Sequence, residues 1–331
     1  MSELRWNPQL REWVITATHR QERTFLPGRD RCPLCPTRHP EAPTEIERST
    51  FEIAVFENRF PSLHREPPEP AVMGTTLTPV APASGACEVV VYTPDHDGSL
   101  TDATLAHLEH LIAVWAHRTL DLGARPEAAY VFVFENRGEA IGVTLEHPHG
   151  QIYAYPHVPP IIAAEVASGE AHAAETGGCL WCDLLAQEKD DQRRLVADGA
   201  HWLVGVPFFA RWPYEVHITS RRHIGWLHEL DGDEISELAL HLKRLLGAYD
   251  RLFGFPLPYV MAIHQRPTDG AAHGDYHLHF EFYPPHRTAD KLKHLAGSEA
   301  GAGAVINDTL PEVTAKRLRG LLADPYDEGR R

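Results

Sequence analysis

The chain has little of three features that would place it in a membrane, outside the cell or on nucleic acid. No apolar run in its 331 residues approaches the roughly 20 residues of a membrane-spanning helix, and residues 1–13 contain no apolar signal-peptide core. Positive charge is scarce, because 31 lysines and arginines against 46 acidic residues leave a net charge of −15. This charge disfavours nonspecific nucleic-acid binding. We therefore expect a cytoplasmic protein with no membrane or nucleic-acid partner.

Cysteine is also scarce, yet four of the five cysteines fall in two Cys-x-x-Cys pairs, and Cys87 stands alone. In a cytosolic chain such pairs bind metal more often than they form disulfides. A structural zinc site has four protein ligands, so each pair needs two more, and 22 histidines are available. The sequence therefore predicts two structural Zn²⁺ ions per subunit, one on Cys32, Cys35, His96 and His147 and one on Cys179, Cys182, His223 and His277.

The order of these motifs repeats along the chain. Each half contains a cysteine pair, an apolar strand, a lone histidine, a helix, a second strand and a His-x-His motif. We expect an α+β fold of two tandem domains, 1–165 and 166–331, with the boundary between them in the stretch 163–178. Each domain is expected to be an antiparallel sheet with packed helices. The expected strands are 51–56, 130–135, 202–206 and 259–265, and the expected helices are 102–118 and 233–253.

The segment 146–153, Glu-His-Pro-His-Gly-Gln-Ile-Tyr, is the strongest indication of chemistry. Alternate side chains of an extended strand share a face, so His147, His149 and Gln151 point the same way. One imidazole can bind metal while the next stays free. A free imidazole held in one tautomer is a good nucleophile toward phosphorus, and a nearby amide can hold a phosphate oxygen. We predict that His149 carries a phosphoryl or nucleotidyl group and that Gln151 assists.

These motifs resemble the galactose-1-phosphate uridylyltransferase family of the histidine-triad superfamily. The resemblance rests on His-Pro-His-Gly-Gln at 147–151, Cys-Pro-Leu-Cys at 32–35 and the segments 13–23, 56–60 and 134–138, and it covers nearly the whole chain. It implies two histidine-triad-like domains in a homodimer whose active sites take residues from both subunits. It also implies exchange of UMP between UDP-glucose or UDP-galactose and hexose 1-phosphates, through a uridylyl-histidine intermediate with ping-pong kinetics, in galactose metabolism.

The resemblance also implies which side chains contact the substrates. Arg20 and Arg23 would hold the distal phosphate, Asn58 would lie near the ribose or base, and Lys293 and Glu299 flank a Gly-rich loop that could close over a hexose. The further implied substrate contacts are Leu34, Phe56, Asn136, Gly142, Thr144 and Gln151.

Three alternatives remain open. Some family members carry their second metal on a set that aligns with Glu165, His264, His279 and Glu281, although we favour the cysteine set here. The activity could instead be that of an ADP-sugar or dinucleoside polyphosphate phosphorylase of the same superfamily. A noncatalytic, zinc-stabilised nucleotide-binding protein would also carry these motifs.

Overall fold

The computed structural model of the chain describes residues 2–23 and 25–322. Its main element is a sheet of nine strands in which every neighbouring pair is antiparallel. In spatial order the strands are β3 (Ala54–Glu57), β5 (Ala86–Val91), β7 (His149–Tyr155), β6 (Tyr130–Arg137), β11 (Tyr259–His264), β12 (His279–Tyr283), β10 (Val216–Ser220), β9 (Trp202–Gly205) and β8 (Leu195–Asp198).

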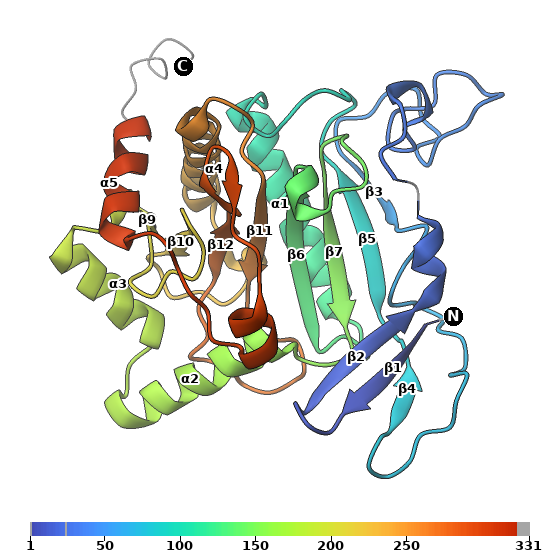
Figure 1. Cartoon of the computed structure of the whole chain (residues 1–331), viewed down its shortest axis with the longest axis horizontal. Coiled ribbons are helices and arrows are strands. Elements are labelled where there is room, and N and C mark those ends of the chain that lie inside the picture. The colour runs from blue at the N-terminus through green and yellow to red at the C-terminus, as the bar shows by residue number, and fades with distance from the viewer. Residues whose placement is uncertain (1, 24, 323–331) are drawn as a thin grey trace.

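The two halves of the chain meet in the middle of this sheet (Figure 1). Strands β6 and β11 pair there, with Tyr259 opposite Arg137 and Ile263 opposite Val133. Outward from this junction, β6, β7, β5 and β3 of the first half correspond to β11, β12, β10 and β9 of the second. The predicted α+β class with antiparallel halves is confirmed. Without this pairing, β6 and β11 would each be an edge strand with unpaired backbone groups, so the junction of the two halves satisfies both edges.

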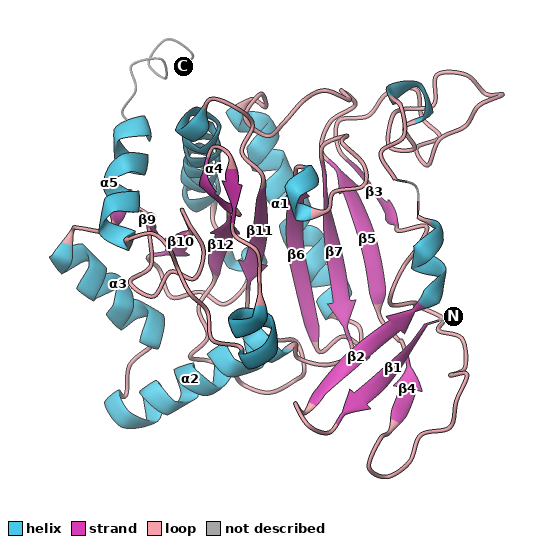
Figure 2. Ribbon diagram, in the orientation of Figure 1, coloured by secondary structure: helices cyan, strands magenta, loops and turns pink. Residues whose placement is uncertain are grey.

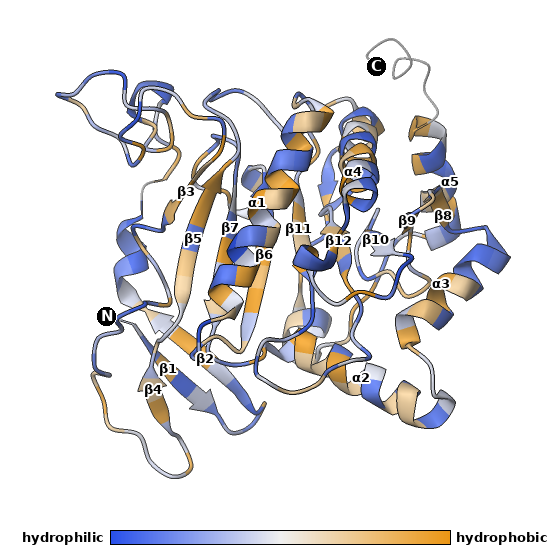
Figure 3. Cartoon of the chain, turned by 180° about the vertical axis from the view of Figure 1, so that it is seen from behind, coloured by the Kyte–Doolittle hydropathy of each residue, from blue (hydrophilic) through white to orange (hydrophobic). Residues whose placement is uncertain are grey.

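Two long helices cover one face of the sheet, as the view from behind shows (Figure 3). Helix α1 (Leu105–Gly123) begins where the Thr104 side chain accepts a hydrogen bond from the His107 backbone, and α4 (Gly232–Phe253) begins at a capping box formed by Asp231 and Glu234. Both helices bury residues at spacings of three and four. The buried apolar side chains include Leu108, Leu111, Ile112 and Trp115 of α1 and Leu238, Leu242, Leu245 and Leu246 of α4.

The opposite face carries a small sheet and two helices (Figure 2). The small sheet has the order β2 (Glu12–Ala17), β1 (Ser2–Asn7) and β4 (Val80–Pro82), and the helices are α2 (Pro160–Thr176) and α3 (Leu180–Asp191). A separate apolar cluster lies between the small sheet and strands β5 and β7, with Leu4, Leu63, Cys87 and Tyr153 among its members. The remaining elements are β13 (His286–Thr288), β14 (Lys291–Leu292), the 3-10 helices Thr18–Glu22, Arg29–Arg31, Glu139–Ile141 and Leu227–Glu229, the π-helical turn Gly297–Gly301 and α5 (Pro311–Leu322).

The predicted elements are present with shifted ends. The helices expected at 102–118 and 233–253 are observed at 105–123 and 232–253. The strand expected to include His147 begins only at His149, and the strand expected at 51–56 is observed at 54–57. The stretch 163–178, in which we expect the domain boundary, lies mostly in helix α2. Among the described residues, no helix is both long enough and apolar enough to span a bilayer.

Candidate active site and metal centres

His149, the first residue of β7, is held in a single orientation. Its Nδ1 lies 2.7 Å from the carbonyl oxygen of His147. Because a carbonyl can only accept, Nδ1 must carry the proton and Nε2 keeps its lone pair. Burial outweighs this hydrogen bond and lowers the pKa of His149, which favours the neutral ring near pH 7. The site therefore presents a neutral imidazole with one free nucleophilic nitrogen.

A cavity of about 400 Å³ lies against His149. Its walls come from the ends of β6 and β7 and from the loop 97–102, and they include the predicted substrate contact Asn136. Arg137 lines the same cavity, but Asp250 binds its guanidinium through two contacts of 2.8 and 3.0 Å. This ion pair joins strand β6, which neighbours β7, to helix α4 of the second half.

Three further predicted residues meet beside β7. The Gln151 side-chain oxygen accepts a hydrogen bond from the Tyr153 hydroxyl at 3.2 Å and from the Asn58 amide nitrogen at 3.5 Å. The Arg20 guanidinium donates to the Phe60 carbonyl at 3.0 Å and to the Tyr153 hydroxyl at 3.4 Å. The structure therefore brings Arg20, Asn58 and Gln151 together around Tyr153. Tyr153 is not among the predicted site residues, although its position two residues after Gln151 on one strand is the signal that indicates it.

Of the other predicted contacts in the first half, Leu34 and Phe56 belong to one apolar cluster. Leu34 is only 2% exposed and packs in an apolar cluster, which leaves it little surface for a ligand. Phe56 is half-buried, Arg23 is exposed and Gly142 has the left-handed φ of +82°. The Thr144 carbonyl accepts a hydrogen bond from the Leu26 backbone at 2.8 Å.

Lys293 and Glu299 lie in the second half and contact each other. The Lys293 ammonium is 3.1 Å from a Glu299 carboxylate oxygen and also donates to the Ile306 carbonyl. Neither residue lines the cavity at His149. Within one chain, the predicted hexose contacts are therefore separate from the predicted nucleophile.

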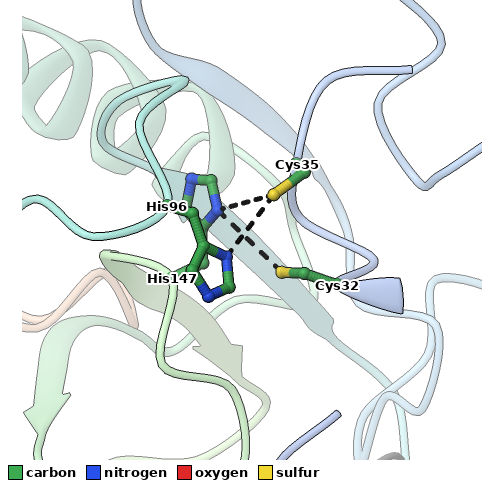
Figure 4. Close-up of side chains that lie close together, drawn as sticks. All are labelled: Cys32, Cys35, His96 and His147. Atoms are coloured by element: carbon green, nitrogen blue, oxygen red, sulfur yellow. Dashed lines mark hydrogen bonds between the residues drawn. The ribbon is translucent and has the colours of Figure 1, made fainter. Parts of the chain in front are cut away.

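The first predicted ligand set is assembled at the loop that precedes β7 (Figure 4). Its sulfur–nitrogen distances are 3.4 Å from Cys35 to His96, 3.5 Å from Cys35 to His147 and 3.9 Å from Cys32 to His147. A tetrahedral zinc ion with ordinary bond lengths requires about 3.6 Å between such atoms. His147 also donates from Nε2 to the Thr93 carbonyl at 2.7 Å, which directs Nδ1 toward the sulfurs. These donors fit a zinc ion.

The second predicted set repeats this arrangement. The sulfurs of Cys179 and Cys182 lie 3.7 and 3.6 Å from His277 Nδ1, and Cys182 lies 3.7 Å from His223 Nδ1. His277 donates from Nε2 to the Ser220 carbonyl at 2.7 Å, and His223 donates to the Gly274 carbonyl at 2.8 Å. Both cysteine sets could therefore hold a metal with the same geometry.

The alternative set, Glu165, His264, His279 and Glu281, is assembled as well. It shares no residue with the cysteine sets, so the two are not alternatives in space. His279 Nδ1 donates to the His277 carbonyl at 2.8 Å, as His149 does to His147. However, Glu281 stands where the first half has Gln151, and the carboxylates of Glu281 and Glu165 raise the pKa of His264 to about 9 against the effect of burial. Glu165, His279 and Glu281 line a cavity of about 540 Å³.

Glu135 is a buried carboxyl group beside the His149 cavity. Burial raises its pKa from 4.5 to about 7, although Arg137 and a 3.1 Å hydrogen bond from the Tyr259 hydroxyl favour the charged form. The folded state therefore binds this proton more tightly than the unfolded chain. Below pH 4.5 both states are protonated and stability is unaffected, whereas stability falls as the pH rises from about 4.5 through 7.

Glu135→Gln should therefore stabilise the protein at pH 8 by about 1–3 kcal/mol and have little effect at pH 4.5. Thermal unfolding at the two pH values measures the difference. Glu139→Gln, which changes an exposed carboxylate on the same cavity, serves as the control and should show no such pH dependence. An equal effect of Glu135→Gln at both pH values would show that its carboxyl has an ordinary pKa.

Comparison with known proteins identifies the family. The N-terminal domain model of galactose-1-phosphate uridyl transferase matches residues 1–159, and the C-terminal domain model matches residues 165–329. The galactose-1-phosphate uridylyltransferase of Thermotoga maritima is 40% identical over 321 residues, which cover 96% of this chain and 98% of that protein.

Two solved structures are similar over most of the chain. A uridylyltransferase structure has 36% identity and a TM-score of 0.85, covering 99% of this chain and 100% of its own. An ADP-glucose phosphorylase from Arabidopsis thaliana with bound ADP-glucose has 25% identity and a TM-score of 0.72, covering 96% and 99%. With both family domains matched in order and a full-length relative at 40% identity, this chain belongs to the galactose-1-phosphate uridylyltransferase family.

Proposed function

We propose that this protein exchanges UMP between UDP-glucose and galactose 1-phosphate through a uridylyl-histidine intermediate, as an enzyme of galactose metabolism. The observation that carries the proposal is the His149 ring, whose Nδ1 proton is engaged by the His147 carbonyl while Nε2 stays free beside a cavity of about 400 Å³. The names of the full-length relatives support the choice of substrates.

The reaction has two similar halves. In the first, His149 Nε2 attacks the α-phosphorus of UDP-glucose, a nitrogen–phosphorus bond forms, and the bond from that phosphorus to glucose 1-phosphate breaks. In the second, a phosphate oxygen of galactose 1-phosphate attacks the same phosphorus and releases His149, which yields UDP-galactose. Because one histidine carries UMP between two similar acceptors, one pocket can serve both sugars in turn.

This exchange needs no strong general acid. The leaving group in either direction is a sugar phosphate, which is a weak base near neutral pH. The developing negative charge on the other phosphate oxygens needs fixed hydrogen-bond donors instead. We assign this role to the Gln151 amide, to the Thr144 hydroxyl and to backbone amides, with Asn136 near the phosphates. Arg20 and Arg23 would hold the distal phosphate.

We also propose that the two cysteine sets each bind Zn²⁺. When bound, such an ion cross-links distant segments of the chain and takes no part in the reaction, because four protein ligands fill its coordination sphere. The first set includes His147, which lies two residues before the nucleophile. Its cross-link would therefore hold the backbone carbonyl that orients His149.

We propose that the protein is a cytoplasmic homodimer. Lys293 and Glu299 are separate from the His149 cavity within one chain, which suits an active site completed by the partner subunit. Light scattering on the purified protein measures the subunit number. A monomer that is fully active would contradict the shared site.

Mass spectrometry of the intact protein after exposure to UDP-glucose tests the proposed function. We expect one uridylyl group per chain, removed by galactose 1-phosphate with formation of UDP-galactose. When both substrates are varied, the initial-rate lines should be parallel, as expected for ping-pong kinetics. The similarity to an ADP-glucose phosphorylase makes ADP-glucose the matched comparison. An adduct only from ADP-glucose would favour that activity, and no adduct from either would favour a noncatalytic nucleotide-binding protein.

A further inference from the structure

We propose that Tyr153 is a positioning residue that sets the orientation of the Gln151 amide, with Arg20 fixing the direction of the hydrogen bonds between them. The inference rests on the proposed function and adds to it a residue outside the predicted substrate and metal sets. Gln151 and Tyr153 are alternate residues of β7 and share one face of the sheet.

The direction of the hydrogen bonds follows from the chemistry of the groups. A guanidinium can only donate, so the Tyr153 oxygen accepts from Arg20 at 3.4 Å. The hydroxyl proton is then available for Gln151, whose side-chain oxygen lies 3.2 Å away. The Asn58 amide nitrogen faces the same oxygen at 3.5 Å. Two donors therefore face one end of the Gln151 amide and identify it as the oxygen.

The Tyr153 ring is itself fixed in place. It is 7% exposed and lies in the apolar cluster with Leu4, Leu63 and Cys87. The Phe134 ring on the neighbouring strand packs edge-on against it at 5.1 Å between centroids. Burial also raises the pKa of Tyr153, so its hydroxyl stays protonated and remains a donor. A rigid donor of this kind can hold the amide in one of its two orientations.

The orientation matters because the two ends of an amide have opposite effects on a phosphate. With its oxygen engaged by Tyr153 and Asn58, Gln151 has its NH₂ group free to donate to a phosphate oxygen during transfer. If the amide turned over, its oxygen would face the phosphate and repel it. Tyr153 would then affect the rate of transfer more than the binding of the nucleotide, because the other substrate contacts remain.

Tyr153→Phe tests this, since it removes the hydroxyl and keeps the ring. We expect the rate of adduct formation from UDP-glucose and the kcat of exchange to fall roughly fivefold to tenfold, as for the loss of one hydrogen bond to a functional group. The KM for UDP-glucose should change less than about twofold, because only transition-state contacts are lost. Tyr155→Phe is the matched control: it removes the next hydroxyl on the same strand face and should have no effect.

A double-mutant cycle separates positioning from a general structural effect. If Tyr153 acts through Gln151, then Tyr153→Phe should cause no further loss of rate in a Gln151→Ala background. An equal loss in both backgrounds, or a Tyr153→Phe enzyme with the wild-type kcat, would overturn the inference while leaving the proposed function intact. Failure of the wild-type protein to form any adduct would overturn the proposed function and this inference together.

Discussion

His149→Ala is expected to abolish the uridylyl adduct and to lower the exchange rate by at least about a thousandfold, because no second group can replace a covalent carrier. The His149 ring contacts the His147 carbonyl through Nδ1 and belongs to none of the candidate metal sets. Its removal should therefore leave both metals and the fold in place. Intact-mass measurement after exposure to UDP-glucose, together with initial rates, reports both losses.

His279→Ala is the matched control for this experiment. His279 occupies the equivalent position in the second half and makes the same hydrogen bond to the residue two before it. Because Glu281 and Glu165 surround it, we expect no uridylyl transfer there, and the adduct should still form on the variant. An active His149→Ala enzyme, or peptide mapping that places the uridylyl group on His279 or His147, would contradict the assignment.

Cys32→Ser is expected to remove one of two zinc ions and to lower the unfolding temperature by about 10 °C or more. The first set brings together three segments that are far apart in sequence, namely the loop at 32–35, His96 and His147. Without the ion, the His147 carbonyl is no longer held, so His149 loses its fixed orientation. Activity should therefore fall although the nucleophile is unchanged. Elemental analysis and thermal unfolding measure the two effects.

Two further variants make the zinc experiment specific. Cys87→Ser changes a buried cysteine outside the metal sets and should retain both ions. Cys179→Ser should remove the other ion and leave the first set intact. Purified wild-type protein with no zinc, or with one ion that persists in Cys179→Ser, would contradict the two-site proposal.

The repeat and the cysteine sets could be predicted because metal ligands constrain spacing strongly. A Cys-x-x-Cys pair and a His-x-His motif in each half limit which segments can meet, and the eight predicted ligands do meet in two sets. Helix α2 shows the opposite case. No helix is predicted there, although alanine, which is frequent in this segment, has the highest intrinsic helix propensity, and the segment forms a helix of 17 residues.

Apart from the metal ligands, contacts between residues far apart in sequence could not be predicted. Arg20 follows β2 of the small sheet and Asn58 follows β3 of the main sheet, and no local pattern encodes the packing that brings both to Tyr153 and Gln151. The carboxylate set at Glu165 and Glu281 was expected only as an alternative to the cysteine set. The cysteine set and the carboxylate set are both assembled, since His277 belongs to the first and His279 to the second.

The pairing of β6 with β11 bears on how such a chain could have arisen. The two strands are equivalents in the repeat and run antiparallel, so the junction has the self-complementary form of a twofold-symmetric dimer interface. An ancestral single-domain protein could have formed the same sheet from two separate molecules, each with its own nucleophile. Fusion of the two genes would make that assembly independent of concentration. It would also free one copy to lose its chemistry, as Glu281 in place of glutamine indicates, while its strands continue to complete the sheet.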